Sequence, residues 1–263
     1  MNYKYPAITK GEILYFQIRE HIQHGSTLKS SPSWFDQFDR GMDWIDYIEE
    51  FMTLNICGQI VKLGKQLRSI HSNSTVFSSE LRSFINDSFT LRRSDLDRLF
   101  RLSKAAVDSS MDNFTRGTKN VIRKFAEDSH RCCYLCGRDL DFADDESDLS
   151  YTADHIWPHE FGGDSVIENL LPCCKDCNNA HKKNYPTWAM TNVHELIKVD
   201  ESELSRTSGT SRFAIHHRFV QKRAIEERIS LKDSYLLTGP SRAVVFSDKN
   251  CIGHFFNLSN CDE

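Results

Sequence analysis

This 263-residue chain contains two C-x2-C pairs, Cys133/Cys136 and Cys174/Cys177, whose residue types and spacing suit the binding of a metal ion. A C-x2-C pair places two thiolates within reach of one zinc ion, and two pairs complete a tetrahedral four-thiolate site. Gly137 follows the first pair directly, as expected where a turn over a metal needs a positive φ. The spacing therefore predicts a structural zinc site that leaves no open position for catalysis.

The zinc interpretation leaves one ambiguity of register and two alternatives. Cys132 and Cys173 directly precede the pairs, so each cluster also fits C-x3-C spacing, although we prefer x2. Disulfides and buried free thiols are the alternatives, but nine cysteines in 263 residues fall below the density of a disulfide scaffold. The N-terminal residues resemble no secretory signal, and no run approaches the roughly 18 apolar residues of a membrane span. We expect a cytoplasmic, reducing setting in which Cys57, Cys251 and Cys261 stay ordinary thiols.

A second set of polar residues lies between the cysteine pairs. It consists of Asp154-His155-Ile156-x-Pro158, Gly162-Gly163 and Asn169-Leu170, and Asn178 follows the last cysteine. With the two C-x2-C pairs, this order and spacing resembles the HNH, or ββα-metal, endonuclease family, in its branch with a four-cysteine zinc site. The resemblance extends from residue 133 to residue 183 and leaves the rest of the chain unassigned.

The resemblance implies two strands and a helix that hold one catalytic divalent cation, and it assigns a role to each polar residue. Asp154 and Asn178 match ligands of that cation, Mg²⁺ or Mn²⁺. His155 matches the general base that takes a proton from the attacking water. Asn169 matches a brace that holds the base through backbone hydrogen bonds. His181 is a further candidate ligand or phosphate contact, where the family more often has lysine.

Neighbouring side chains of a strand point to opposite faces. Asp154 can therefore serve the cation while His155 serves the water only if the strand ends or bends at this point. Pro158 and the Gly162-Gly163 pair provide that irregularity.

The implied activity is hydrolysis of phosphodiester bonds, with 5′-phosphate and 3′-hydroxyl products and DNA as the expected substrate. By analogy with HNH subunits that act with an ATPase or a sensor, restriction or anti-phage defence is the expected setting. The alternative is a non-catalytic zinc module that binds nucleic acid or protein. The enzyme is favoured because Asp154, His155 and Asn178 are superfluous to that alternative.

The charge balance constrains how such an enzyme would hold phosphates. The net charge is −4, and residues 131–185 carry five Lys and Arg against eleven Asp and Glu. Because phosphate binding depends on basic contacts, they must come from basic side chains beside or within the motif: Lys119, Arg123, Lys124, Lys182 and Lys183. A basic segment over 212–228 is a further source. Solvated helix faces, or a partner protein that supplies the contacts, are the alternatives.

The elements that must position these residues are mainly helical. Apolar residues at steps of three and four over 38–70 predict a long amphipathic helix, in which Gly58 and Gly64 mark a kink or a close helix crossing. Ser94 and Asp97 predict a capping box at a second helix, and Gly117 separates it from a short helix over 119–127. Further helices are expected over 187–199 and 213–225, with a loop over 205–211 and short apolar runs in the tail at 243–246 and 255–256.

We therefore predict an α+β fold that is mainly helical and has three parts. Residues 1–117 form a helical region for partner binding or dimerisation. Residues 118–190 form the ββα-metal nuclease module with its structural zinc. Residues 191–263 form a C-terminal helix and a tail that pack on the core.

Overall fold

The computed structural model describes residues 4–25, 44–71, 73–89, 91–181 and 209–241. Several predictions lie outside these residues: the part of the long N-terminal helix before residue 44, the helix over 187–199, the apolar runs of the tail, Lys182 and Lys183. Cys251 and Cys261 lie outside them as well.

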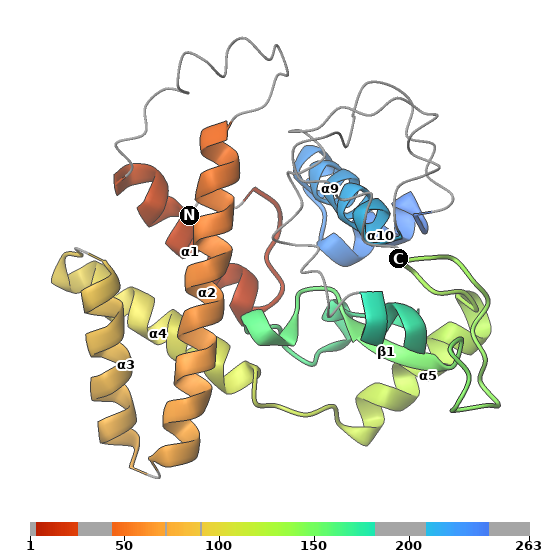
Figure 1. Ribbon diagram of the computed structural model, residues 1–263, viewed down its shortest axis with the longest axis horizontal. Helices are drawn as coiled ribbons and strands as arrows, with labels where there is room; N and C mark the ends of the chain where they lie inside the picture. The colour runs from red at the N-terminus through yellow and green to blue at the C-terminus, as the bar shows by residue number, and fades with distance from the viewer. Residues whose placement is uncertain (1–3, 26–43, 72, 90, 182–208, 242–263) are drawn as a thin grey trace. The chain divides into compact units, whose positions relative to one another are not determined.

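The described residues form a mainly helical α+β fold, which confirms the predicted class (Figure 1). The helices before the sheet are α1 (Lys10–Gly25), α2 (Trp44–Ile70), α3 (Ser74–Ser88), α4 (Arg93–Ser109) and α5 (Arg116–Ser129). The sheet is a β-hairpin of β1 (Tyr151–His155) and β2 (Leu170–Cys174), and its connection contains the 3-10 turns η2 (His159–Phe161) and η3 (Ile167–Asn169). A π-helical turn, η4 (Cys177–His181), follows, and then α9 (Gly209–Glu227) and α10 (Leu231–Thr238).

The chain divides into two compact units, each discontinuous in sequence. The helical unit comprises Met1–Ser26, Glu49–Lys119 and His155–Leu170, and the zinc unit comprises Thr27–Ile48, Asn120–Asp154 and Leu171–Glu263. The connection of the hairpin thus groups with the N-terminal helices, while most of the hairpin groups with the cysteines. The predicted domain boundaries after residues 117 and 190 stay a prediction.

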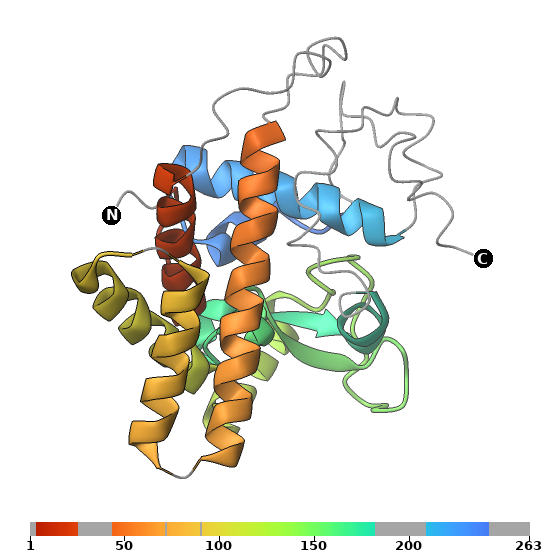
Figure 2. The same cartoon turned by 60° about the vertical axis from the view of Figure 1, so that its left-hand side comes forward.

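Helices α2 and α3 lie side by side (Figure 2), and the two glycines of α2 lie at close approaches inside the helical unit. A Cβ added at Gly64 would lie 2.2 Å from Cγ2 of Val107 in α4, and one at Gly58 would lie 2.9 Å from Cε1 of Phe161 in η2. Of the two predicted roles for these glycines, the close crossing is therefore confirmed. Arg68 adds a polar link, since it pairs with Asp108 of α4 at 2.8 Å.

The predicted capping box at Ser94 is wrong. Helix α4 begins at Arg93, and its N-cap residue Arg92 makes no side-chain capping bond. Asp97, the expected capping partner, instead pairs with Arg82 of α3. A carboxylate bonds a guanidinium more strongly than a neutral backbone N–H, so a tertiary ion pair replaces the local cap.

Two other helix starts differ from their predictions because small polar residues begin the helix earlier. Helix α5 begins at Arg116, so Gly117 lies in its first turn; Oγ1 of Thr115 accepts from the backbone N–H of Thr118 at 3.0 Å, a capping bond. Helix α9 begins at Gly209, so the predicted loop over 205–211 is wrong at its last three positions. Gly, Ser and Thr favour helix N-termini as well as loops, which explains the misassignment.

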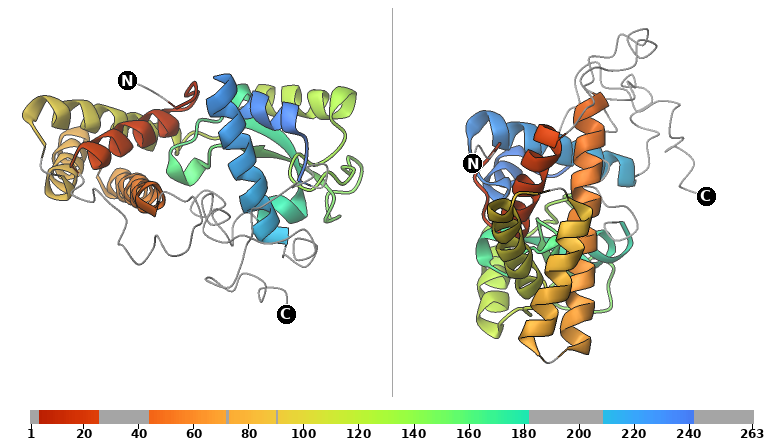
Figure 3. Two further views of the ribbon diagram at one scale, coloured as in Figure 1. Left: turned by 90° about the horizontal axis from the view of Figure 1, so that it is seen from above. Right: turned by 90° about the vertical axis from the view of Figure 1, so that its left-hand side faces the viewer.

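The C-terminal helices α9 and α10 pack on each other within the zinc unit (Figure 3). Helix α9 confirms the amphipathic helix predicted over 213–225, with Phe213, Val220 and Ala224 buried. After α10, the backbone N–H and the hydroxyl of Ser241 both donate to the carbonyl oxygen of Leu135, at 2.8 and 2.7 Å. This pair of bonds ties the C-terminal helices to the turn between Cys133 and Cys136.

Within the described part of the chain, no helix combines the length and apolar character that crossing a membrane requires.

Candidate active site and metal centre

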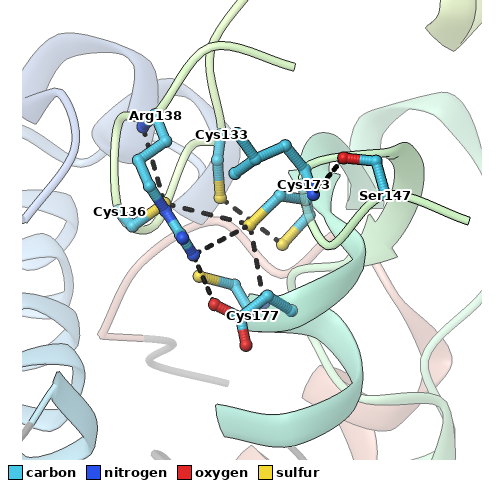
Figure 4. Close-up of polar contacts among 9 residues, drawn as sticks. Cys133, Cys136, Arg138, Ser147, Cys173 and Cys177 are labelled. Carbon is cyan, nitrogen blue, oxygen red and sulfur yellow. Dashed lines mark hydrogen bonds and ion pairs between the residues drawn. The ribbon is translucent and has the colours of Figure 1, made fainter. Parts of the chain in front are cut away.

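Four cysteine thiols form a compact cluster in the zinc unit (Figure 4). The sulfur atoms of Cys133, Cys136, Cys174 and Cys177 all lie within 4.8 Å of one another. This is the donor set of a closed structural zinc site, so the residues fit the predicted ion. The x2 register is therefore confirmed, although Cys173 lies close by, with its sulfur 3.7 Å from that of Cys133.

The backbone of the first pair folds as a metal knuckle. Gly137 has a φ of 73°, as its position predicted, and its N–H donates to the carbonyl oxygen of Cys133 at 2.8 Å. The N–H of Arg138 points at the sulfur of Cys136 at 3.5 Å, and the N–H of Cys177 points at that of Cys174 at 3.5 Å. Such N–H donors stabilise thiolates, the form that binds zinc.

Arg138 connects the two knuckles. Its Nε lies 3.4 Å from the sulfur of Cys136, one terminal nitrogen lies 3.8 Å from that of Cys174, and the same nitrogen pairs with the carboxylate of Asp176 (Figure 4). These contacts, first that with Cys136, raise the pKa of the guanidinium. The cation therefore offsets part of the negative charge that four thiolates bring to one centre.

Hydrogen bonds among the four thiols shift their pKa values in opposite directions. Hydrogen bonds within the cluster lower the pKa of Cys133, first through Cys136, and that of Cys174, first through Cys133. The same bonds, first through Cys133, raise the pKa of Cys136 and of Cys177. Zinc binding requires all four thiolates, so it releases the protons that the cluster retains.

Asp154, the predicted cation ligand, is 5 % exposed near the end of β1. Its Oδ2 accepts a hydrogen bond of 2.6 Å from the hydroxyl of Tyr134, which lies between the cysteines of the first knuckle. Burial, and after it the charge of Asp154, raise the pKa of Tyr134, so the hydroxyl keeps its proton and acts as the donor. Sequence reasoning missed Tyr134, and its only signal was its place between two zinc cysteines.

Asn178, the second predicted ligand, directly follows Cys177 within the π-helical turn η4. Its Nδ2 donates to Oγ1 of Thr152 at 3.1 Å, and that hydroxyl donates to the carbonyl oxygen of Cys173 at 2.8 Å. Thr152 and Asp154 are two residues apart in β1 and therefore share a face of the strand. Asn178 thus lies on the face that carries Asp154, with its carboxamide oxygen as the ligand atom that it can offer.

His155, the predicted base, is the last residue of β1, so the strand ends where the sequence requires. Its ring lies 4.7 Å from that of Phe114 and 5.0 Å from that of His159, measured between centroids. Its Nε2 lies 3.0 Å from the hydroxyl oxygen of Ser165, which donates to the carbonyl oxygen of Asp112 at 3.2 Å. Phe114 and Asp112 follow α4, outside the motif, and the sequence gives no signal for either.

Asn169 is 3 % exposed at the end of η3. Its Oδ1 accepts from the N–H of Trp157 at 2.7 Å, and its Nδ2 donates to the carbonyl oxygens of Trp157 and Asp164 at 3.1 and 3.0 Å. Its carbonyl oxygen accepts from the N–H of Ile156 at 2.8 Å. The Asn169 side chain therefore links the start of the connection after His155 to its end, which is the geometry expected of a brace.

The N-terminal helices hold the same connection from outside. The carboxylate of Asp164 accepts from the N–H of Lys10 at 2.5 Å and from the hydroxyl of Ser109 at 2.7 Å. The N–H of Gly11 donates to the carbonyl oxygen of Gly162 at 2.9 Å. The start of α1 and the end of α4 therefore both bind the connection that follows His155.

The predicted nucleic-acid contacts are only partly described. Lys119, Arg123 and Lys124 are exposed on α5, where Arg123 pairs with Glu127 at 2.8 Å and also donates to the carbonyl oxygen of Phe142. The amine of Lys119 lies 6.0 Å from the centre of the Phe114 ring. The side chain of His181 lies outside the described residues.

Comparison with known proteins gives one family. Residues 133–192 match the family model described as HNH endonuclease. No curated protein and no solved structure matches the chain. The matched segment begins at the first cysteine of the cluster and includes the hairpin, its connection and Asn178.

Proposed function

Because the chain carries an HNH endonuclease domain at residues 133–192, we propose that it is a metal-dependent endonuclease that hydrolyses DNA. The domain implies a phosphodiester hydrolase with a nucleic acid as substrate. DNA as that substrate, and the roles of individual residues, are our proposal.

The observation that carries the proposal is the placement of two oxygen-bearing side chains beside the thiol cluster. Asn178 directly follows Cys177 in η4, and its side chain contacts Thr152 on the face of β1 that also carries Asp154. A carboxylate and a carboxamide oxygen suit Mg²⁺ or Mn²⁺, whereas four thiolates suit zinc. We assign the catalytic cation to Asp154 and Asn178, and the structural zinc to the cluster.

We assign Nδ1 of His155 as the nitrogen that acts as base, a choice that the hydrogen bonds of Ser165 support. The hydroxyl of Ser165 has a single proton, which it donates to the carbonyl oxygen of Asp112. With the proton of the neutral ring on Nε2 of His155, the Ser165 oxygen accepts from it at 3.0 Å. In this tautomer Nδ1 is the basic nitrogen, and we propose that it takes a proton from water.

The reaction then proceeds by in-line attack on phosphorus. As Nδ1 of His155 takes its proton, the water oxygen bonds to phosphorus and the bond to the 3′ oxygen breaks. The leaving 3′ oxygen takes a proton from solvent, so the products are a 5′-phosphate and a 3′-hydroxyl. A bound Mg²⁺ or Mn²⁺ would stabilise the negative charge that develops on the phosphoryl and leaving oxygens.

Substrate contacts and biological setting complete the proposal. Lys119 and Lys124 are exposed cations that can bind phosphates beside an acidic motif segment. Lys182, Lys183 and His181 remain candidates at the end of that segment. We place the enzyme in restriction or anti-phage defence, with a regulatory protein or a second copy bound through the N-terminal helices.

A plasmid-nicking assay with Mg²⁺ or Mn²⁺ tests the assignment. We expect His155→Ala to lose nicking by at least about a hundredfold, because a general base contributes about 10²–10⁴ in rate, and to keep its zinc. The matched control is His71→Ala, since His71 lies directly after α2 and its side chain forms an ion pair with Glu80, away from the motif. Equal nicking by His155→Ala and the native protein would contradict the assignment of His155 as the general base.

A further inference from the structure

We propose that Tyr134 is a positioning residue for the catalytic cation. Its hydroxyl fixes the orientation of the Asp154 carboxylate and thereby couples the cysteine cluster to the cation site. The inference rests on the proposed function, in which Asp154 is a cation ligand.

The contact between the two side chains is short and buried. The Tyr134 hydroxyl donates to Oδ2 of Asp154 at 2.6 Å, and both residues belong to the zinc unit. A hydrogen bond to a carboxylate is about twice as strong as one between neutral groups. A carboxylate has about four lone-pair sites on two oxygens, so Asp154 can bind a cation while it accepts from Tyr134. The bond limits rotation of the carboxylate, so its other lone pairs keep one direction.

Tyr134 is itself held at both ends. It lies between Cys133 and Cys136, whose sulfurs belong to the cluster, and its backbone N–H donates to the carbonyl oxygen of Pro172 in β2 at 3.0 Å. The backbone of Tyr134 is therefore fixed to the cysteine cluster and to the hairpin. The hydrogen bond from its hydroxyl therefore restrains the side chain of Asp154, which lies twenty residues away in sequence.

The C-terminal helices hold the ring of Tyr134. The ring of Tyr235 in α10 meets it edge-on, with 5.0 Å between centroids and an interplanar angle of 84°. The hydroxyl of Tyr235 shares a hydrogen bond with Nδ1 of His217 in α9, and both side chains are buried. Tyr235 and His217 lie beyond residue 192, where the family match ends. This chain therefore supports its metal ligand with residues from outside the matched segment.

Outer partners of metal ligands affect affinity for the metal, which gives the test. The zinc-loaded full-length protein is titrated with Mn²⁺, and bound ion is measured by electron paramagnetic resonance without nucleic acid. We expect Tyr134→Phe to raise the Mn²⁺ Kd by about 10- to 100-fold, the typical effect of losing such a partner. Zinc content should be unchanged, because the substitution removes one oxygen and keeps the ring.

Tyr151→Phe is the matched control. Tyr151 begins β1 in the zinc unit, and its buried hydroxyl has no hydrogen-bond partner. The same substitution there removes a hydroxyl that does not contact Asp154, so the Mn²⁺ Kd should stay at the native value. Should Tyr134→Phe lose zinc, Tyr235→Phe replaces it in the comparison, with a smaller rise in Kd expected.

Asp154→Ala defines the site in the same titration, because it should abolish the Mn²⁺ binding that Tyr134→Phe weakens. The proposal is overturned if native Mn²⁺ binding does not depend on Asp154, or if Tyr134→Phe binds Mn²⁺ with the native Kd. A native protein that binds Mn²⁺ through Asp154 but never nicks DNA would instead overturn the proposed function, so the two failures are distinguishable.

Discussion

Two consecutive residues of β1 are held by two different regions of the molecule. In the zinc unit, Asp154 takes its orientation from Tyr134, inside the first cysteine knuckle. In the helical unit, His155 packs against Phe114, and Ser165 links its ring to the backbone after α4. The first arrangement depends on four thiols and short hydrogen bonds, and the second depends on helix packing and the shape of one loop.

The difference shows how damage to each region should appear. Loss of one thiolate removes a ligand whose binding energy is folding energy, so the zinc unit should fail as a whole. Loss of one contact in the helical unit should instead displace the base by a small amount and leave the zinc in place. Zinc content and nicking should therefore separate the two regions.

The largest effect is expected from Cys174→Ala. Structural zinc contributes about 10–16 kcal/mol in small zinc modules, so three thiolates should bind zinc weakly and the zinc unit should unfold. Zinc content by mass spectrometry and thermal unfolding by circular dichroism measure the loss.

Cys132→Ala is the control for the cluster, because Cys132 lies outside it. This variant should keep its zinc and its Tm. Zinc loss in Cys132→Ala together with retention in Cys174→Ala would contradict the assigned register.

The contrast between the regions also explains what the sequence could predict. The four cysteines of the cluster could be predicted from their spacing, because a C-x2-C turn places its two sulfur atoms close together. Tyr134 and Asp154 meet only after the hairpin and both knuckles have formed, so no local pattern predicts their bond. The backbone hydrogen bonds of the Asn169 side chain were predicted only through the family resemblance.

Prediction was weakest in the helical unit. Sequence analysis did not predict α1, because residues 14–19 are all buried and leave no polar stripe in the middle of the helix. Gln17 and Arg19 are among these buried residues, which further weakens the apolar pattern. The contacts of Lys10 and Phe114 with the connection of the hairpin join segments far apart in sequence, so they depend on how the helices pack.

Gly162→Ala tests the shape of the helical unit and should have the next largest effect. Gly162 has a φ of 83°, and an added Cβ would lie 2.7 Å from Cβ of Ala106 in α4. Strain at positive φ and overpacking together should lower the free energy of unfolding by about 2–4 kcal/mol. Nicking should fall because the loop of the base must shift, while zinc content stays native.

Gly117→Ala is its control. An added Cβ there meets only Oγ1 of Thr115, at 3.7 Å, within the first turn of α5. Alanine is favoured over glycine in a helix by about 1 kcal/mol, so stability should stay equal or rise slightly. A Gly162→Ala variant as stable and active as Gly117→Ala would contradict the dependence of the base on α4.

The smallest effect is expected from Ser165→Ala, which removes only the hydroxyl between His155 and the backbone of Asp112. Without the hydroxyl, Nε2 of His155 loses the acceptor that keeps its proton there, and the unproductive tautomer becomes more populated. A lost hydrogen bond of about 1 kcal/mol corresponds to a fall in kcat of roughly fivefold. The Mn²⁺ Kd should stay native, the reverse of Tyr134→Phe, and Ser69→Ala on the exposed end of α2 should change neither quantity. A change in Mn²⁺ Kd without a change in kcat would show that Ser165 acts on the cation rather than on the base.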